Sequence, residues 1–93
     1  PTAFGLSQNF PNPFNPTTVI EYQVPEQADV ILQVFNVQGQ LINTLVNNNQ
    51  TAQSYKVIWD GRDMNGAMVP SGVYFYQIQA NSFTETRALL FMK

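Results

Sequence analysis

The side chains of this chain that could take part in chemistry are mainly carboxylates, and their densest cluster lies in one short segment. Asp60, Asp63 and Asn65 sit together in a loop that also carries glycines. Hard cations such as Ca²⁺ bind oxygen ligands of this kind. The spacing D-x-x-D-x-N-G does not match an EF-hand loop, however, and no bidentate Glu follows it. Because Asp and Asn also bond to their own backbone in turns, we interpret the three residues as turn formers and keep them only as weak candidates for a metal site.

No arrangement of residues points to catalysis. Two carboxylates can act as acid and base in glycosidases, but Asp29, Asp60 and Asp63 all lie in or beside predicted turns. The chain has no histidine and no cysteine, which removes the commonest general base and any thiolate metal ligand. Ser71 lies in the sequence PSG and not in the nucleophile motif G-x-S-x-G. We therefore expect a protein that is not an enzyme and that needs no cofactor.

The charge pattern argues against nucleic acid as a partner. The net charge is −2 and the charged fraction is 11%, against about 25% in typical globular proteins. Phosphate binding needs clustered Lys and Arg, whereas the four basic residues here are scattered. No apolar run reaches the ~20 residues of a membrane span. The chain does not start with Met and shows no signal peptide, so we interpret it as a module of a larger protein.

The elements that must position these residues are β-strands. Alternation of apolar and polar residues predicts strands over residues 17–24, 28–36, 41–46, 53–59, 73–80 and 83–92. Segment 41–46 also allows a helix, but its Thr, Ile and Val favour a strand. The polar run 47–50 has no periodicity, and we expect it to be a loop. With a short edge segment before residue 73, the pattern of about seven strands predicts an all-β, immunoglobulin-like antiparallel β-sandwich.

The strongest strand signal is VYFYQIQA at 73–80, which follows the turn signals Asp60-Gly61 and Asn65-Gly66. This strand is apolar on both faces at its start, so we expect it in the middle of a packed sheet, with Trp59 packing nearby. Ile31 and Phe35 of the strand at 28–36, and Val37 just after it, lie on the face opposite to the core residues. We therefore expect part of that second face to be covered as well.

Residues 1–5 look like the remnant of a linker, and residues 6–16 form a proline-rich segment, which we call the strap. Phe10 and Phe14 lie four residues apart in a proline-fixed backbone, which predicts that both rings dock in pockets of the sandwich. Exposed aromatic rings could instead stack on sugars, but core packing is the interpretation that we prefer. The candidates for such stacking are Phe10, Phe14, Trp59, Tyr74, Phe75 and Tyr76.

Three stretches together resemble one family. They are LSQNFPNPFNPTTVIEY at 6–22, VFNVQGQLINTLV at 34–46 and WDGRDMNGAMVPSGVYFYQIQA at 59–80, and TRALLFMK closes the chain. In this order they resemble the type A C-terminal sorting domain of the type IX secretion system, and the resemblance covers residues 6–93. The chain is also similar to the immunoglobulin-like domain of the flagellar hook-capping protein, which implies the same sandwich.

The resemblance implies a non-catalytic sorting function. Such domains form the C-terminal part of secreted proteins of Gram-negative bacteria. In the periplasm they are recognised by a translocon of the outer membrane. In many relatives a sortase-like peptidase then removes the domain, and the passenger at its N-terminal side is attached to the cell surface or released outside. The implied partners are therefore the translocon, the peptidase and the passenger. Two alternatives stay open, namely a structural or adaptor module and a small carbohydrate-binding module of a secreted enzyme.

The resemblance also implies roles for particular residues. The strap motif comprises Asn9, Phe10, Pro11, Asn12, Pro13, Phe14, Asn15 and Pro16. The recognition motifs comprise Gly72, Tyr74, Tyr76, Arg87, Leu89, Leu90, Phe91, Met92 and Lys93. The chain departs from the family in having Phe10 in place of the usual Tyr and Ala88 where a Lys often follows Arg87. Each of these residues could also have a purely structural role. Edge strands offer unpaired backbone groups to a partner strand, so we hypothesise that a translocon pairs with the last strand.

Overall fold

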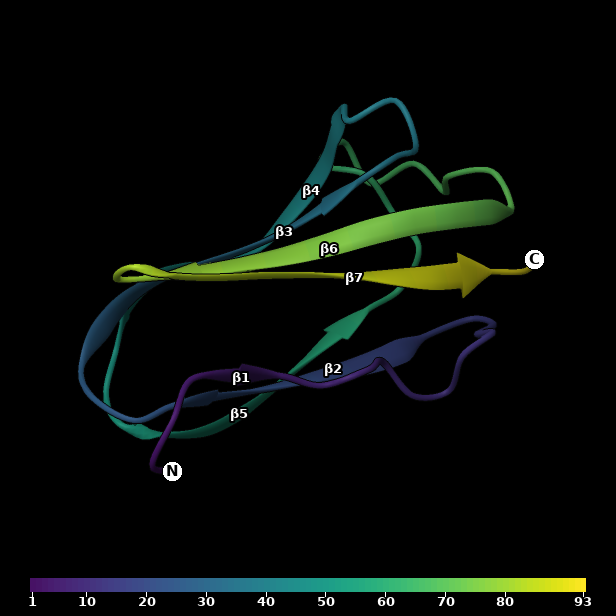
Figure 1. Cartoon of the computed structure of the whole chain (residues 1–93). Coiled ribbons are helices and arrows are strands. Elements are labelled where there is room, and N and C mark those ends of the chain that lie inside the picture. Colours follow the sequence, from purple (N-terminus) through teal and green to yellow (C-terminus); the bar gives the residue numbers. More distant parts are fainter.

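The computed structural model describes all 93 residues and contains seven strands (Figure 1). They are β1 (Gly5–Leu6), β2 (Thr18–Val24), β3 (Ala28–Phe35), β4 (Leu41–Gln50), β5 (Gln53–Trp59), β6 (Gly72–Ala80) and β7 (Phe83–Phe91). No helix is present that has the length and apolar character needed to cross a membrane.

The strands form two antiparallel sheets that face each other as the layers of a sandwich (Figure 1). The three-stranded sheet has the order β1-β2-β5, and the four-stranded sheet has the order β4-β3-β6-β7. Strand β6 therefore lies inside its sheet, as its aromatic sequence predicts, and β7 lies at the edge. The predicted immunoglobulin-like β-sandwich is confirmed.

The core is built from alternating residues of both sheets. In β2 and β3 every second side chain is buried, because successive side chains of a strand point to opposite faces. Trp59 is 1% exposed, and its ring centroid lies 5.6 Å from that of Tyr74. The Tyr74 hydroxyl donates a 2.7 Å hydrogen bond to the carbonyl of Pro70, an arrangement typical of the tyrosine corner in immunoglobulin-like domains. The expected packing of Trp59 against the central strand is thus confirmed.

The turns before β6 follow the glycine signals. Gly61 and Gly66 have φ angles of 76° and 83°, in the left-handed region where glycine has no steric cost. A Cβ atom on Gly61 would also lie 2.7 Å from the Phe91 ring. At this point the loop therefore approaches the core too closely for any other residue.

The expectation of a loop at residues 47–50 is wrong. These residues extend β4, and Asn47 and Gln50 pair with Ile31 and Ala28 of β3. Strand β4 is an edge strand, so its ladder with β3 holds the backbone while the polar side chains stay in solvent. The Asn49 amide adds a 2.9 Å hydrogen bond to the Asp29 carboxylate. Alternation of apolar and polar residues is not needed in this part of β4, because few of its side chains enter the core.

Part of the segment that we interpret as a linker remnant packs on the sandwich. Gly5 pairs with Gln23 in β2. The ring of Phe4 stacks on that of Phe83 at a centroid distance of 5.4 Å. The ordered packing therefore begins at Phe4, slightly before the predicted start of the domain at residue 6.

Candidate functional site

The strap runs between β1 and β2 and joins the two sheets along one side of the sandwich. Phe14 is 1% exposed, and its ring centroid lies 4.9 Å from that of Phe91 and 5.6 Å from that of Trp59. Phe10, in contrast, is 78% exposed. The prediction of two docked rings is therefore right for Phe14 and wrong for Phe10. The backbone N–H and carbonyl of Phe10 pair with Val19 at 3.0 and 2.8 Å, and this pairing directs the ring to the outer face.

Asn9 is the polar centre of the strap. It is 2% exposed, and its backbone N–H donates a 2.8 Å hydrogen bond to the Tyr76 hydroxyl. Its side-chain amide donates to Thr18 Oγ1 at 3.0 Å and to the Pro11 carbonyl at 3.2 Å. The Tyr76 hydroxyl in turn donates to the Ser7 carbonyl at 2.7 Å. Burial raises the pKa of this hydroxyl above its ordinary value of 10.0. The strap is thus fixed to the central strand β6 by a buried and fully paired network.

The strap also covers half of the β7 edge. The N–H of Phe14 donates to the Leu90 carbonyl at 3.1 Å, and the N–H of Met92 donates to the Phe14 carbonyl at 3.1 Å. The N–H of Leu90 donates to the side chain of Asn12 at 3.0 Å, and the Gln8 amide donates to the Ala88 carbonyl at 2.7 Å. The outward backbone groups of β7 from the Ala88 carbonyl onward are therefore already paired within the chain.

The first half of β7 is protected in a different way. Glu85 and Arg87 lie on its inward side, 3.0 Å apart, and Arg87 Nε donates to the Leu6 carbonyl at 2.6 Å. Inward-pointing charges on an edge strand discourage pairing with another strand. The last strand is an edge strand, as we expect, but the structure does not offer it as a free edge for a partner strand.

The residues of the predicted recognition motifs separate into two groups by the alternation of the strands. Four of them belong to the core and are 5% exposed or less, namely Tyr74, Tyr76, Leu89 and Phe91. Three are accessible, because Leu90 is half-buried and Met92 and Lys93 are exposed. Gly72 begins β6 with a φ of 151°, and nothing lies within 4 Å of the position a Cβ atom would take. In the folded domain a partner could therefore contact the outward group and the partly exposed Arg87, whose side chain is 38% exposed, but not the four core residues.

The loop with the weak metal candidates is held by its own hydrogen bonds. The Asp63 carboxylate accepts the backbone N–H groups of Asn65 at 2.9 Å and Ala67 at 3.0 Å. Asp60 forms an ion pair of 3.6 Å with Arg62. No group of three His, Cys, Asp or Glu side chains lies close enough together to hold a metal ion. The interpretation of these residues as turn formers explains their contacts.

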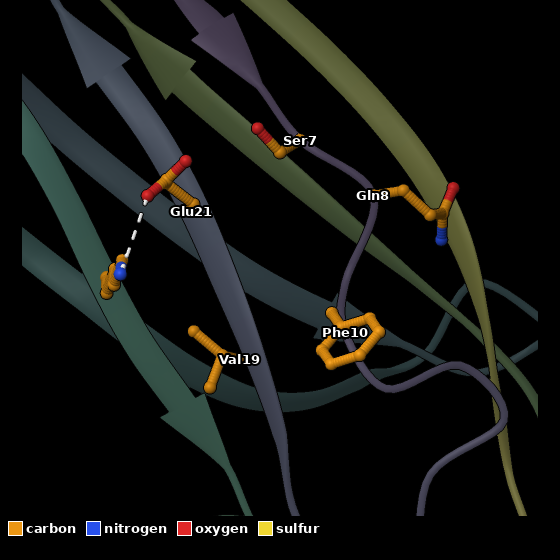
Figure 2. A pocket seen from close by; sticks show the side chains of 6 residues that line it. Ser7, Gln8, Phe10, Val19 and Glu21 are labelled. Carbon is orange, nitrogen blue, oxygen red and sulfur yellow. Dashed lines mark ion pairs between the residues drawn. The ribbon is translucent and has the colours of Figure 1, made fainter.

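An open cavity of ≈ 350 Å³ lies on the outer face of the three-stranded sheet, beside the strap (Figure 2). It is lined by Ser7, Gln8, Phe10, Val19, Glu21 and Lys56. Glu21 forms an ion pair of 3.9 Å with Lys56 across the sheet (Figure 2). Of the aromatic residues suggested for sugar stacking, Phe10 alone is exposed, because the others are buried or, in the case of Phe75, half-buried. The cavity thus offers one ring and one ion pair, and no platform of several rings.

The outer face of the four-stranded sheet carries an apolar surface whose exposure the sequence does not predict. The register places Leu41, Phe35, Phe75 and Ala88 in one row across all four strands, and Val73 beside Leu90 in the next. We expect part of this face to be covered, but all seven strands belong to the two sheets, and no third layer lies over it (Figure 1). The signal in the sequence was the apolar character of both faces of β3 and β6. We call these six residues the outer apolar patch.

The chain matches the family model described as the FlgD Ig-like domain over residues 12–83. Among solved structures it is similar to dimeric latent PorU from Porphyromonas gingivalis, with a TM-score of 0.74 and 16% identity over 91% of this chain. It is similar to FlgD from P. aeruginosa, with a TM-score of 0.62 and 27% identity over 80% of this chain. It is also similar to PorZ from Porphyromonas gingivalis, an essential surface component of the type IX secretion system, with a TM-score of 0.63 and 18% identity over 97% of this chain.

The chain is comparable with only a part of each of these structures. It spans 9% of PorU, 58% of FlgD and 11% of PorZ. No curated protein matches it. The match to the FlgD Ig-like domain model confirms the predicted similarity to the hook-capping protein's immunoglobulin-like domain, and the solved structures confirm the predicted fold.

Proposed function

We propose, from the premise that this chain belongs to the FlgD Ig-like domain family, that it is a non-catalytic sorting domain of the type IX secretion system. The observation that carries the proposal is that the separate sequence motifs meet in one place. The strap contacts β6 through Asn9 and Tyr76, and it contacts β7 through Phe14 and Phe91. The similarity in fold to PorZ, a surface component of that secretion system, supports the same assignment.

In this proposal the domain follows a passenger protein, which it directs across the outer membrane of a Gram-negative bacterium. A translocon in that membrane reads the folded domain in the periplasm, and a sortase-like peptidase removes it after export. The passenger then stays at the cell surface or is released. The domain itself performs no reaction, and its contribution is a stable fold that presents a recognition surface.

A reporter fusion tests the proposal in a host with the type IX machinery. A folded reporter that ends in this domain should reach the cell surface or the medium, whereas the reporter alone should stay in the periplasm. Equal export of both would show that the domain is a structural or adaptor module. Retention of both, with the domain folded, would also contradict the sorting function.

The structure decides how the domain should be altered in such a test. Deletion of residues 89–93 would remove Leu89 and Phe91, which are 2% and 1% exposed. It would also remove most of the β7 segment that the strap contacts. Loss of export would then report unfolding as well as loss of recognition. Single substitutions at outward positions keep the core intact and separate the two effects.

A binding experiment addresses the carbohydrate-binding alternative. Phe10 is the one exposed ring of the cavity, so a sugar would have to stack there. Affinity electrophoresis through soluble polysaccharides, with Phe10→Ala as the control, should show no retardation of either protein. Retardation of the unaltered domain that Phe10→Ala abolishes would favour the carbohydrate-binding module.

A further inference from the structure

The outer apolar patch has no partner within the chain, although it lies across a complete sheet. Val73 and Leu41 are 45% and 40% exposed. Phe35, Phe75 and Leu90 are half-buried, and the register places Phe35 beside Phe75 and Leu90 beside Val73. The largest contiguous apolar patch on a monomeric soluble protein is often an interaction site.

A polar row borders the patch and shows where it ends. Gln33 Nε2 donates to Thr44 Oγ1 at 3.2 Å, and Gln77 Nε2 donates to Thr86 Oγ1 at 3.0 Å. The register places these four residues side by side across the sheet. Each glutamine thus bonds to the threonine on the neighbouring edge strand. The apolar part of the face lies on the other side of this row, next to the last residues of β7.

The charged residues around the patch indicate what kind of surface its partner must present. The outward residues of the sheet include a single charged side chain, Asp29, which lies at the opposite end. Lys56, Arg62 and Arg87 each form an ion pair with a carboxylate. The Lys93 side chain forms none. Lys93 follows Met92, which is 52% exposed, and its backbone N–H donates to Ser71 Oγ at 2.9 Å, so both residues lie at the rim of the patch beside the start of β6. The surface is therefore apolar and uncharged, with one free cation at its border.

These features favour a protein partner over the alternatives. An anionic membrane surface attracts clusters of Lys and Arg, and here there is one lysine. A partner strand would need a free edge, and the β7 edge next to the patch is occupied by the strap. A protein with an apolar groove and an acidic residue at its rim complements both the patch and Lys93.

Resting on the sorting function proposed above, we infer that the outer apolar patch is the surface by which the secretion machinery recognises the folded domain. The partner presents an uncharged apolar groove to Phe35, Val73, Phe75 and Leu90, and a carboxylate to Lys93. The motif at the end of the chain thus has two roles. Leu89 and Phe91 stabilise the core, whereas Leu90, Met92 and Lys93 contact the recognition partner.

Export of the reporter fusion tests the inference with substitutions on the two outer faces. The test variant is Val73→Thr combined with Leu90→Thr, because Thr keeps a high strand propensity while it removes apolar surface. The matched control is Ile58→Thr, since Ile58 is 64% exposed on the outer face of the other sheet. The test variant should lower the exported fraction about tenfold or more, and the control should match the unaltered domain. Lys93→Glu should also lower export, and Lys93→Arg should retain it.

The outcomes separate the inference from the proposed function. If the unaltered fusion and the test variant are exported equally, the inference fails and the sorting function stands. If the unaltered fusion is folded but not exported, both fail. The thermal midpoints of all variants are measured beside export, and Val73→Thr alone provides a milder variant if the double substitution lowers stability.

Two solution measurements check the other occupants of the patch. Sedimentation of the purified domain should show a monomer, and flotation with phosphatidylcholine–phosphatidylglycerol vesicles should show no binding. A dimer that the test variant dissociates would assign the patch to a second copy of the chain and overturn the inference. Vesicle binding that the test variant abolishes would assign it to a membrane, with the same consequence.

Discussion

Two parts of the molecule carry large apolar side chains outside the regular inward positions of the strands, and the fold treats them differently. In the strap, the Phe14 ring is 1% exposed and contacts both sheets through Trp59 and Phe91. On the outer face of the four-stranded sheet, Val73 and Leu41 remain 45% and 40% exposed. The strap, which looks like a loop in the sequence, is part of the core. The outer face, although regular strands form it, is not covered by another element of the chain.

The difference teaches that, in the function proposed above, stability and recognition depend on separate surfaces of one small domain. The strap closes the side of the sandwich at β7, where a free edge would otherwise invite pairing with other chains. The outer apolar patch can then stay accessible without exposing that edge as well. Substitutions in the strap should therefore change the free energy of unfolding, and substitutions on the outer face should change binding. Three predictions test the contribution of the strap and of the buried tyrosines to stability.

The largest effect is expected from the buried ring of the strap. Phe14→Ala should lower the free energy of unfolding by about 3–5 kcal/mol, because it leaves a cavity between Trp59 and Phe91. Phe10→Ala, four residues earlier, should change it by less than about 0.5 kcal/mol, because that ring is 78% exposed. Urea denaturation followed by tryptophan fluorescence measures both. Equal losses in the two variants would show that the strap does not dock as described.

An intermediate effect is expected from the polar centre of the strap. Asn9→Ala should cost about 1–3 kcal/mol, because it removes hydrogen bonds to Thr18 and Pro11 in a buried site. Asn15→Ala provides the control, since Asn15 is exposed. The same denaturation experiment applies. If both variants retained the stability of the unaltered domain, the buried network would contribute only specificity of docking.

The smallest effect is expected at alkaline pH. Burial raises the pKa values of Tyr22, Tyr74 and Tyr76 above 10.0. The folded state therefore binds these protons more tightly than the unfolded state, so their contribution to stability is complete below about pH 10 and is lost as the pH rises further. The urea midpoint should fall between pH 10 and 11, and less steeply in Tyr22→Phe. A midpoint that stayed level over this range would contradict the burial of the three hydroxyl groups.

The strands and the fold class could be predicted from local patterns because alternation of apolar residues is a property of neighbouring positions. The patterns of β2, β3, β5 and β6 each follow from which side of the strand meets the core. The extension of β4 over 47–50 could not be predicted in this way. Its polar residues are strand because β3 pairs with them, and that pairing joins residues about 20 positions apart in the chain.

The sequence alone determined the sandwich, the turns at Gly61 and Gly66, and the membership of the strap and the last strand in one motif set. It left Phe10 and Phe14 equivalent, and it grouped residues 87–93 as one recognition element. Only the tertiary structure decided which ring is buried, which residues of β7 belong to the core, and which edge is already paired. The physical reason is that the alternation of apolar and polar residues is a property of neighbouring positions in the chain. Burial depends instead on which distant strand packs against each side chain.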